Sequence, residues 1–399
     1  MSDLDGKLLA AHAAGDQWAL VGLYAEAADH ADGVDAACFY LTQAYIYGLE
    51  LAHPDVPALH ARLDAEGRVW GLHAGPAKAS VASKGDIMAP RKIIIDTDPG
   101  QDDAVAILLA LASPELEVLG ITAVAGNVPL PLTQKNARII CELAGKPETR
   151  VFAGCDAPLK RKLVTAEHVH GKTGLDGPKM DDPTMPLEDQ HAVDFLIETL
   201  RSEPEKTVTL CPLGPLTNIA SAFLKAPDII PRVQEIVLMG GAYFEVGNIT
   251  PAAEFNIYVD PEAAEIIFKS GVPLVVMPLD VTHKALTTRP RIESFRNLGT
   301  RPGTMVAEWT DFFERFDMEK YGSQGAPLHD PCVIAYLLDP YLFSGREINV
   351  EIETTSELTL GMTVADWWRV TKRAPNCLFI GDIQADGFFR LLTDRIGRL

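Results

Sequence analysis

The sequence predicts an α/β fold, in which a mainly parallel sheet is covered by helices on both faces and is preceded by a small all-α N-terminal domain. From Lys92 onward, continuous apolar runs alternate with helical patterns, as in parallel strands that are buried on both faces. Before that point only helical spacing occurs, and 399 residues exceed the usual length of one domain. We therefore expect a helical domain at 1–70, a linker at 71–90 and a larger domain at 91–399.

The N-terminal segment carries apolar residues at helical spacing between residues 4 and 68, and glycine-aspartate pairs at 15–16 and 32–33 mark turns. This arrangement resembles the antiparallel hairpins of tetratricopeptide and Sel1-type repeats. Two hairpins without a matched period favour a small helical appendage, and a repeat that binds a protein partner through residues 1–70 is the alternative. Residues 71–90 are small and weakly patterned, which predicts a linker.

The elements of the larger domain follow from the same two patterns. Short apolar runs predict strands at 92–96, 117–124, 151–153, 207–211, 235–239 and 273–278. Amphipathic stretches between them predict helices at 102–112, 132–144, 216–225 and 261–270. Ligands of such folds bind beyond the carboxyl ends of the strands, so the polar residues that follow each strand are the candidates for a site.

Charge and cysteine content exclude several classes of function. The formal net charge of -20 at pH 7 comes with no Lys/Arg-rich run, so we expect neither nucleic acid nor an anionic membrane surface as a partner. No apolar run approaches the ~20 residues of a membrane span, and the chain does not open like a signal peptide. The six cysteines are scattered without metal-ligand spacing, which fits a reducing compartment. These observations together predict a cytoplasmic protein.

An acidic cluster follows the first predicted strand, with Asp96, Asp98, Asp102 and Asp103 inside eight residues. Gathered at one end of a sheet, these carboxylates repel one another unless a cation or the positive end of a helix offsets their charge. A hard divalent metal is the simplest occupant. Any one of these aspartates alone could be an ordinary helix cap. The turn at Gly100 allows Asp98 and Asp103 to point at one ion while Asp102 faces a ligand.

Other strand ends offer neutral oxygen and amide groups. Asn127 follows the second strand, and a backbone carbonyl in the segment that begins with Leu213 could serve as a metal ligand, although each also reads as a plain turn. The long connection after the strand at 235–239 holds three further residues that together suit the vicinal hydroxyls of a sugar, which need both donors and acceptors. These residues are Asn248, Glu254 and Asn256.

Two histidines occur beside these polar groups. His329 precedes Asp330 and Pro331 at the start of an apolar helix, where Asp330 alone would be a common helix cap. An imidazole beside a carboxylate can carry out acid or base chemistry near neutral pH. His170 lies in a glycine-rich loop and could equally be an ordinary surface histidine.

Five segments in this order resemble the inosine-uridine preferring nucleoside hydrolase family. They are IIIDTDPGQDDAVAI, AVAGNVPL, LGPLTNIA, GNITPAAEFNIYVDPEAA and LHDP, and the resemblance covers roughly residues 91–398. The family cleaves the N-glycosidic bond of ribonucleosides with one bound Ca²⁺. The first 90 residues lie outside the resemblance and receive no function from it.

The resemblance implies a role for each matched position. Asp98, Asp103 and Asp330 would bind the Ca²⁺ together with the backbone carbonyl of Leu213. The ribose hydroxyls would be held by Asp102, Asn127, Asn248, Glu254 and Asn256. Asp98 would take a proton from a water that the Ca²⁺ acidifies, and His329, with His170, would face the departing base. The presence of His329 resembles members that accept both purine and pyrimidine nucleosides, and a homodimer or homotetramer is expected.

Two other functions compete with this interpretation. The apolar strand followed by Asp96-x-Asp98 also resembles haloacid-dehalogenase-like phosphohydrolases, in which the first Asp is the nucleophile and Mg²⁺ is the metal. A catalytically inactive nucleoside-binding protein is the second alternative. The Asp102-Asp103 pair and the sugar-binding loop favour nucleoside hydrolysis over both.

Aromatic residues near 310–325 are left without a role. Loops near 160–180 and 310–325 would cap the pocket, but the helical spacing of these aromatic residues favours core packing. The residues concerned are Phe312, Phe313, Phe316 and Tyr321.

Overall fold

The computed structural model describes residues 3–31, 33–51, 53–65, 89–321 and 325–399. Contacts within the chain divide it into two units, Met1–His73 and Ala74–Leu399, and each is described by itself. Most of the predicted linker, and the side chains of Phe316 and Tyr321, lie outside the described residues. Within the described part of the chain, no helix is both long enough and apolar enough to cross a lipid bilayer.

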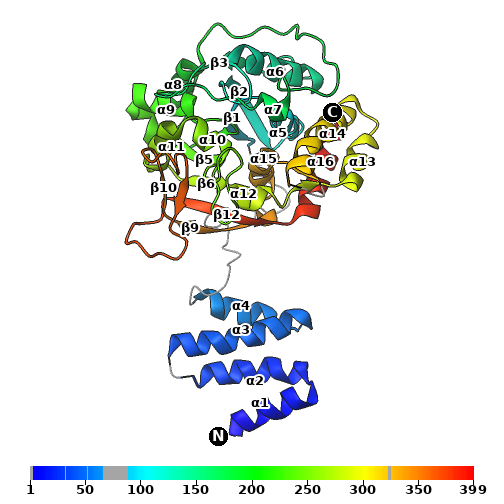
Figure 1. Ribbon diagram of the computed structural model, residues 1–399, viewed down its shortest axis with the longest axis vertical. Coiled ribbons are helices and arrows are strands. Elements are labelled where there is room, and N and C mark those ends of the chain that lie inside the picture. The colour runs from blue at the N-terminus through cyan, green and yellow to red at the C-terminus, as the bar shows by residue number, and fades with distance from the viewer. Residues whose placement is uncertain (1–2, 32, 52, 66–88, 322–324) are drawn as a thin grey trace. The chain divides into compact units, whose positions relative to one another are not determined.

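The N-terminal unit consists of helices in which consecutive members run antiparallel (Figure 1). They are α1 (Asp3–Ala14), α2 (Gln17–Asp29), α3 (Val34–Glu50) and α4 (Val56–Ala65). Asp16 caps α2 by accepting a hydrogen bond from the Ala19 amide at 3.0 Å, which explains why the predicted turn falls there. Val21, Leu41 and Leu63 belong to an apolar cluster that is formed within this unit. The predicted all-α N-terminal domain is confirmed.

Because that cluster draws only on the N-terminal unit, a chain that lacks residues 1–87 is expected to remain folded and soluble. Its thermal unfolding midpoint should lie within about 3 °C of that of the corresponding transition of the full chain, because no core residue of the larger unit is removed. Calorimetry of the two chains measures this difference.

A matched control for this deletion is a chain that ends before α16 (Ala385–Ile396), a segment that supplies the buried Phe388 and Leu392 to the core of the larger unit. We expect that chain not to fold. Loss of solubility on removing residues 1–87 would show instead that the N-terminal helices cover part of the larger unit or an interface between copies.

The larger unit is built on an eight-stranded sheet with the strand order β3-β2-β1-β4-β5-β6-β12-β9. Every neighbouring pair is parallel except β12 and β9. Its strands are β1 (Arg91–Thr97), β2 (Leu116–Ala123), β3 (Val151–Ala153), β4 (Val208–Pro212), β5 (Val233–Met239), β6 (Leu274–Met277), β9 (Phe343–Ile348) and β12 (Cys377–Ile383). The first six correspond to the six predicted strands.

The chain moves outward from β1 through β2 to β3, and then continues from β4 on the other side of β1 through β5 to β6. The order of the sheet therefore reverses between β1 and β4. In open α/β sheets such a switch point leaves a crevice beyond the carboxyl ends of the strands, where ligands bind. The acidic segment that follows β1 begins at this point.

Helices cover both faces of the sheet (Figure 1). Side chains of β1 alternate between the two layers, since Ile93 and Ile95 join one apolar core and Ile94 joins the other. One core includes residues of α5 (Gln101–Leu111), α6 (Leu130–Leu143), α13 (Arg289–Arg296), α14 (Arg301–Tyr321), α15 (Pro331–Leu338) and α16. The other includes residues of α8 (Ala192–Ser202), α9 (Thr217–Lys225) and α11 (Pro261–Phe268). The predicted fold class is confirmed.

The larger unit also contains several short elements. The helical ones are α7 (Glu167–His170), α10 (Phe255–Val259), α12 (Leu279–Thr282) and two 3-10 turns, Pro227–Arg232 and Pro340–Leu342. The extended ones are β7 (Leu286–Thr287), β8 (Ala326–Pro327), β10 (Val350–Ile352) and β11 (Thr363–Ala365). Several of them lie in the connections that follow the carboxyl ends of the central strands, and they position the side chains of the site.

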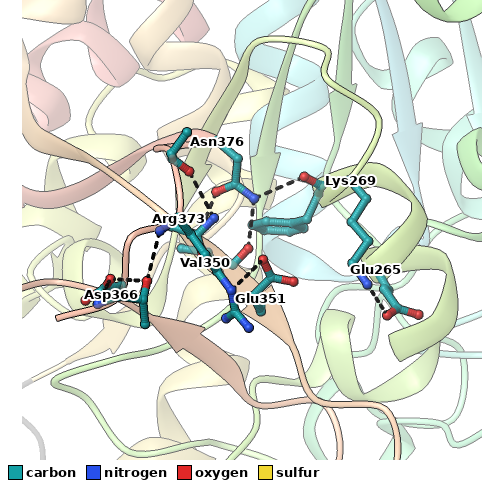
Figure 2. A network of polar contacts seen from close by, with 11 residues as sticks. Glu265, Lys269, Val350, Glu351, Asp366, Arg373 and Asn376 are labelled. Atoms are coloured by element: carbon teal, nitrogen blue, oxygen red, sulfur yellow. Dashed lines mark hydrogen bonds and ion pairs between the residues drawn. The ribbon is translucent and has the colours of Figure 1, made fainter. Parts of the chain in front are cut away.

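A polar network fastens the β10–β11 hairpin to α11 (Figure 2). The Asn376 side chain exchanges two hydrogen bonds with the backbone of Val350, at 2.8 and 2.9 Å, and donates a third to the Phe268 carbonyl at 3.1 Å. One amide side chain thus satisfies the backbone of two elements that are distant in sequence. None of the residues labelled in Figure 2 lines the pocket described below, so this network supports the scaffold.

Candidate active site

A pocket opens beyond the carboxyl ends of the central strands. Each of five parallel strands contributes a lining residue at its end or in the connection that follows it. These residues are Asp102 after β1, Asn127 after β2, Leu213 after β4, Met239 at the end of β5 and His283 after β6. The pocket therefore lies at the switch point of the sheet.

Three buried carboxylates lie close together at this pocket. Oxygen atoms of Asp102, Asp103 and Asp330 all lie within 4.8 Å of one another, and all three residues are buried. Burial, followed by the charge of Asp103, raises the pKa of the Asp102 carboxyl to about 7. Burial and the neighbouring charge of Asp102 raise the pKa of Asp330 well above its usual value. The structure thus brings Asp102 together with the two predicted metal ligands Asp103 and Asp330.

Asp98, the residue that follows β1, lies beside the same cluster. Its side chain is fully buried, and burial together with the charge of Asp103 raises the pKa of its carboxyl well above the usual value. The Asn127 amide donates to Asp98 Oδ2 at 2.6 Å, whereas Asp98 Oδ1 has no hydrogen-bond partner among the described residues. A buried carboxylate oxygen without a donor is a position that a cation would satisfy.

Two glycines leave room for Asp98. A Cβ atom at Gly126 would lie 2.0 Å from Asp98 Oδ2, and one at Gly214 would lie 2.1 Å from Asp98 Oδ1. Any larger residue at either position would collide with the carboxylate. The sequence GN after β2 and LG after β4 therefore allows the backbone to approach Asp98 closely from both sides.

The start of each neighbouring helix positions one acidic residue. Asp103 accepts a hydrogen bond from the Gly100 amide at 2.9 Å and another from the Thr97 hydroxyl, so this carboxylate also caps α5. Asp330 occupies the N-cap position of α15, yet its side chain makes no capping hydrogen bond. The ordinary cap interpretation therefore accounts for part of the role of Asp103 and does not account for Asp330.

The donor set suits a hard cation such as Ca²⁺. Calcium binds carboxylate and carbonyl oxygens at ~2.4 Å, so oxygens on opposite sides of one ion are ~4.8 Å apart. Leu213 lines the pocket, and its carbonyl accepts a hydrogen bond from Asn256 Nδ2 at 2.6 Å, which leaves a second lone pair for another partner. The residues present therefore fit a bound divalent metal.

Amide side chains and one further carboxylate also line the pocket. Glu254 caps α10 by accepting hydrogen bonds from the amides of Asn256 at 3.0 Å and Ile257 at 3.3 Å, and it also accepts one from Gly241 at 3.0 Å. Burial raises the pKa of its carboxyl to about 7. Asn248 Oδ1 accepts a hydrogen bond from the Phe255 amide at 2.9 Å. Asn248, Glu254 and Asn256, for which the sequence suggested sugar binding, all line the pocket.

Histidine and phenylalanine rings also line the pocket. His170 Nδ1 lies 2.6 Å from Gln101 Oε1, and the His170 ring stacks on Phe313 with centroids 5.5 Å apart. Burial lowers the pKa of His170 to about 3, so its ring is neutral. His329 is half-buried, the desolvation of its ring lowers its pKa well below the usual value, and its Nδ1 lies 2.7 Å from Thr282 Oγ1. Phe313 lines the pocket as well as packing in the core, a role that helical spacing did not predict.

Sequence reasoning missed His283, which lines the pocket beside His329. Their ring centroids are 5.8 Å apart. A signal was present, because His283 follows the predicted strand at 273–278 by a few residues, in the same position relative to its strand as the other site residues.

The fold and the pocket define an α/β enzyme whose site joins an acidic centre suited to a cation with a wall of amides and a group of histidines. The chain belongs to the inosine-uridine preferring nucleoside hydrolase family, whose model matches residues 93–390. The resemblance that the sequence motifs indicated is confirmed, and the protein is a nucleoside hydrolase by family.

Several known proteins are similar to this chain outside the N-terminal helices. An uncharacterized protein of Schizosaccharomyces pombe is 52% identical over 308 residues, covering 77% of this chain and 99% of that protein. The pyrimidine-specific ribonucleoside hydrolase RihA of Salmonella paratyphi B is 48% identical over 305 residues, which make up 76% of this chain and 97% of that protein. Among solved structures, the purine-preferring ribonucleoside hydrolase of Gardnerella vaginalis has a TM-score of 0.72 and 35% identity, over 77% of this chain and 98% of that one.

Proposed function

We propose that the protein hydrolyses the N-glycosidic bond of purine and pyrimidine ribonucleosides in a Ca²⁺-dependent reaction that yields the free base and ribose. One observation carries the proposal: a single pocket brings together buried carboxylates, amide side chains and histidines. A ribonucleoside presents groups that match them, namely a cluster of hydroxyls and a flat aromatic base.

The sugar half of the substrate would occupy the acidic end. Asp98, Asp103, Asp330 and the Leu213 carbonyl would hold Ca²⁺, and Asp102 stands close enough to Asp103 and Asp330 to contact either the ion or a hydroxyl on it. Asn127, Asn248, Glu254 and Asn256 would accept and donate hydrogen bonds to the remaining hydroxyls. Their own backbone contacts hold these side chains in place before the ribose arrives.

The proposed chemistry begins at Asp98. A bound Ca²⁺ would supply the positive charge that holds a water and lowers its pKa. The Asp98 carboxylate would take a proton from the attacking water, whose oxygen would bond to C1′ as the bond to the base breaks. Positive charge develops on the ribosyl ring, and the surrounding carboxylates of Asp102 and Glu254 stabilise it.

The departing base would meet the histidines. His329 and His170 line the same pocket, and His329 assists departure of the base through a hydrogen bond. A neutral imidazole can donate or accept with either ring nitrogen, which suits both purine and pyrimidine leaving groups. Two of the similar proteins are a pyrimidine-specific and a purine-preferring ribonucleoside hydrolase, which supports a substrate range within ribonucleosides.

A phosphohydrolase that uses Asp96 as its nucleophile has no support. Asp96 Oδ1 accepts hydrogen bonds from Thr122 and Asn218, and its carboxyl, unlike that of Asp98, does not interact with the charges of Asp102 and Asp103. Asp96 therefore braces β1 against its neighbours and stands apart from the acidic cluster.

Turnover of a substrate panel tests the proposal. Inosine, adenosine, uridine, cytidine and nicotinamide riboside are each incubated with the enzyme and scored for free ribose, and p-nitrophenyl phosphate serves as the control for phosphohydrolase activity. We expect ribose from at least one purine and one pyrimidine nucleoside and no release of phosphate. Binding of these nucleosides without release of ribose would show a nucleoside-binding protein and overturn the proposal.

A further inference from the structure

Gln101 has no role in the reaction described above, although it is buried and directly precedes Asp102 at the start of α5. Its side-chain nitrogen Nε2 donates hydrogen bonds to two backbone carbonyls, that of His170 at 3.0 Å and that of Asp176 at 3.1 Å. Its oxygen Oε1 lies 2.6 Å from Nδ1 of the His170 ring. One amide side chain therefore joins the first residue of α5 to the loop that follows α7 and to the ring of His170.

These contacts decide which nitrogen of the His170 ring carries a proton. A carbonyl oxygen can only accept, so the Gln101 atom that contacts two carbonyls has to be the NH₂ group. The other atom is then an oxygen, which also only accepts, so His170 Nδ1 has to be the donor. Burial and, to a lesser extent, the charge of His168 lower the pKa of His170 to about 3, so the ring is neutral. A neutral imidazole has one N–H, which leaves Nε2 as an acceptor.

The surroundings of His170 make Nε2 the nitrogen that a ligand can reach. The ring rests directly on the turn before α5, because a Cβ atom at Gly100 would lie 2.4 Å from His170 Nδ1. Nε2 makes no hydrogen bond with any residue that the structure describes. His170 lines the pocket together with Phe313, Ala166 and Val169. This aromatic and apolar setting suits a flat base better than the hydroxyls of a sugar.

A second buried amide ties the same loop without touching the ring. Asn136, on α6, is as buried as Gln101, and its Nδ2 donates to the Pro99 carbonyl at 3.0 Å and to the Thr173 carbonyl at 2.8 Å. Both amides thus fasten the loop after His170 to the start of α5. They differ in one respect, since Gln101 also accepts a hydrogen bond from the His170 ring.

We propose that Gln101 is a positioning residue that fixes His170 as a hydrogen-bond acceptor in the pocket, and that this acceptor recognises an N–H group of the nucleobase, such as N3–H of uracil. The inference rests on the proposed function. No proton is transferred in this contact, because Nε2 accepts a hydrogen bond and Nδ1 keeps its proton on Gln101. A base that carries a methyl group in place of that hydrogen would leave the acceptor unpaired.

Nitrogen-15 NMR of the full chain tests the first half of the proposal without a substrate. The chain is labelled in its histidine rings, and the signals of His170 are those that disappear in H170N. We expect a protonated Nδ1 and a bare Nε2 at pH 7. Q101M keeps the length of the side chain but cannot accept from Nδ1, so the proton should then be shared between the two nitrogens. N136L is the matched control and should leave the signals of His170 as in the parent.

A protonated Nε2 in the parent would overturn the inference, and so would signals of His170 that are the same in Q101M as in the parent. The parent measurement needs no variant, so it decides the question even if Q101M does not fold.

The ratio of kcat/KM for uridine to that for 3-methyluridine tests the second half. We expect the parent to prefer uridine by at least ~10-fold, the usual cost of leaving a buried polar group unpaired. Q101M should reduce this preference by ~5-fold, the value of one neutral hydrogen bond, whereas N136L should keep it even if both substrates turn over more slowly. A purely structural role of Gln101 would slow both substrates equally.

An unchanged ratio in Q101M would therefore overturn the recognition of the base by His170. Failure of the parent to release ribose from uridine would overturn the proposed function and, with it, this recognition. The NMR result would still report separately whether Gln101 sets the position of the proton.

Discussion

Replacement of Asp98 with Asn is expected to lower kcat by ~10³-fold for uridine and inosine while binding of ribose is retained, because an amide cannot accept the proton of the attacking water. Asn has nearly the shape of Asp, and its oxygen can still accept the Asn127 amide that now contacts Asp98 Oδ2 at 2.6 Å. The glycines at 126 and 214 leave the same space for it. Release of ribose measures kcat, and calorimetric titration with ribose measures binding.

Asp260 provides a matched control for this substitution. It is as fully buried as Asp98, and it accepts hydrogen bonds from Leu159 and Thr217 away from the pocket. D260N should therefore lower the midpoint of thermal unfolding, through mismatched donors, without changing kcat. If D98N retained activity within a few-fold of the parent, Asp98 could not be the base.

Removal of the metal with a chelator is expected to reduce ribose release to background and to destabilise the protein. Four carboxylates meet at this site, and without a cation their charges repel in a buried place. Calcium at ~1,000 times its dissociation constant would stabilise the folded state by about 4 kcal/mol. Differential scanning calorimetry with and without the chelator measures this, and added Ca²⁺ should restore both quantities.

The destabilisation of the metal-free protein should depend on pH. The pKa of Asp102 is raised to about 7 in the folded state, above the value of an unfolded aspartate. At low pH a carboxyl group with a raised pKa is protonated and does not lower the free energy of unfolding. As pH rises through about 7 it loses its proton, and its buried charge then destabilises the fold. The loss of unfolding midpoint on chelation is therefore expected to be larger at pH 8 than at pH 5. Equal midpoints with and without chelator at pH 8 would contradict a resident cation.

The strands β1 to β6 could be predicted because their sequences carry a strong local signal. Ile93, Ile94 and Ile95 are fully buried, since both faces of β1 are covered, and such a run of branched apolar residues admits few other structures. The positions of Asp98, Asn127 and Leu213 followed from the same logic, because each lies just beyond the end of a central strand.

Other elements carry no comparable signal. The helix α8 is capped by a ring nitrogen of His191, which accepts the Val193 amide at 3.2 Å, and histidine is not a residue that marks a helix start. The strands β9 and β12 mix apolar residues with Arg346, Glu347 and Asp382, because this pair forms the antiparallel margin of the sheet, where side chains are partly exposed. The Gln101–His170 pair depends on a tertiary contact between the start of α5 and the end of α7, so spacing along the chain could not reveal it.

The acidic residues and the rings of the pocket come from different elements. The acidic residues stand just beyond a central strand and at the starts of α5 and α15, whose positions the whole core determines. The rings come from α7, from α14 and from the segments that flank β7 and β8. Under the proposed function, substitutions in the segments that carry the rings are expected to change which base is accepted while the acidic residues keep their positions.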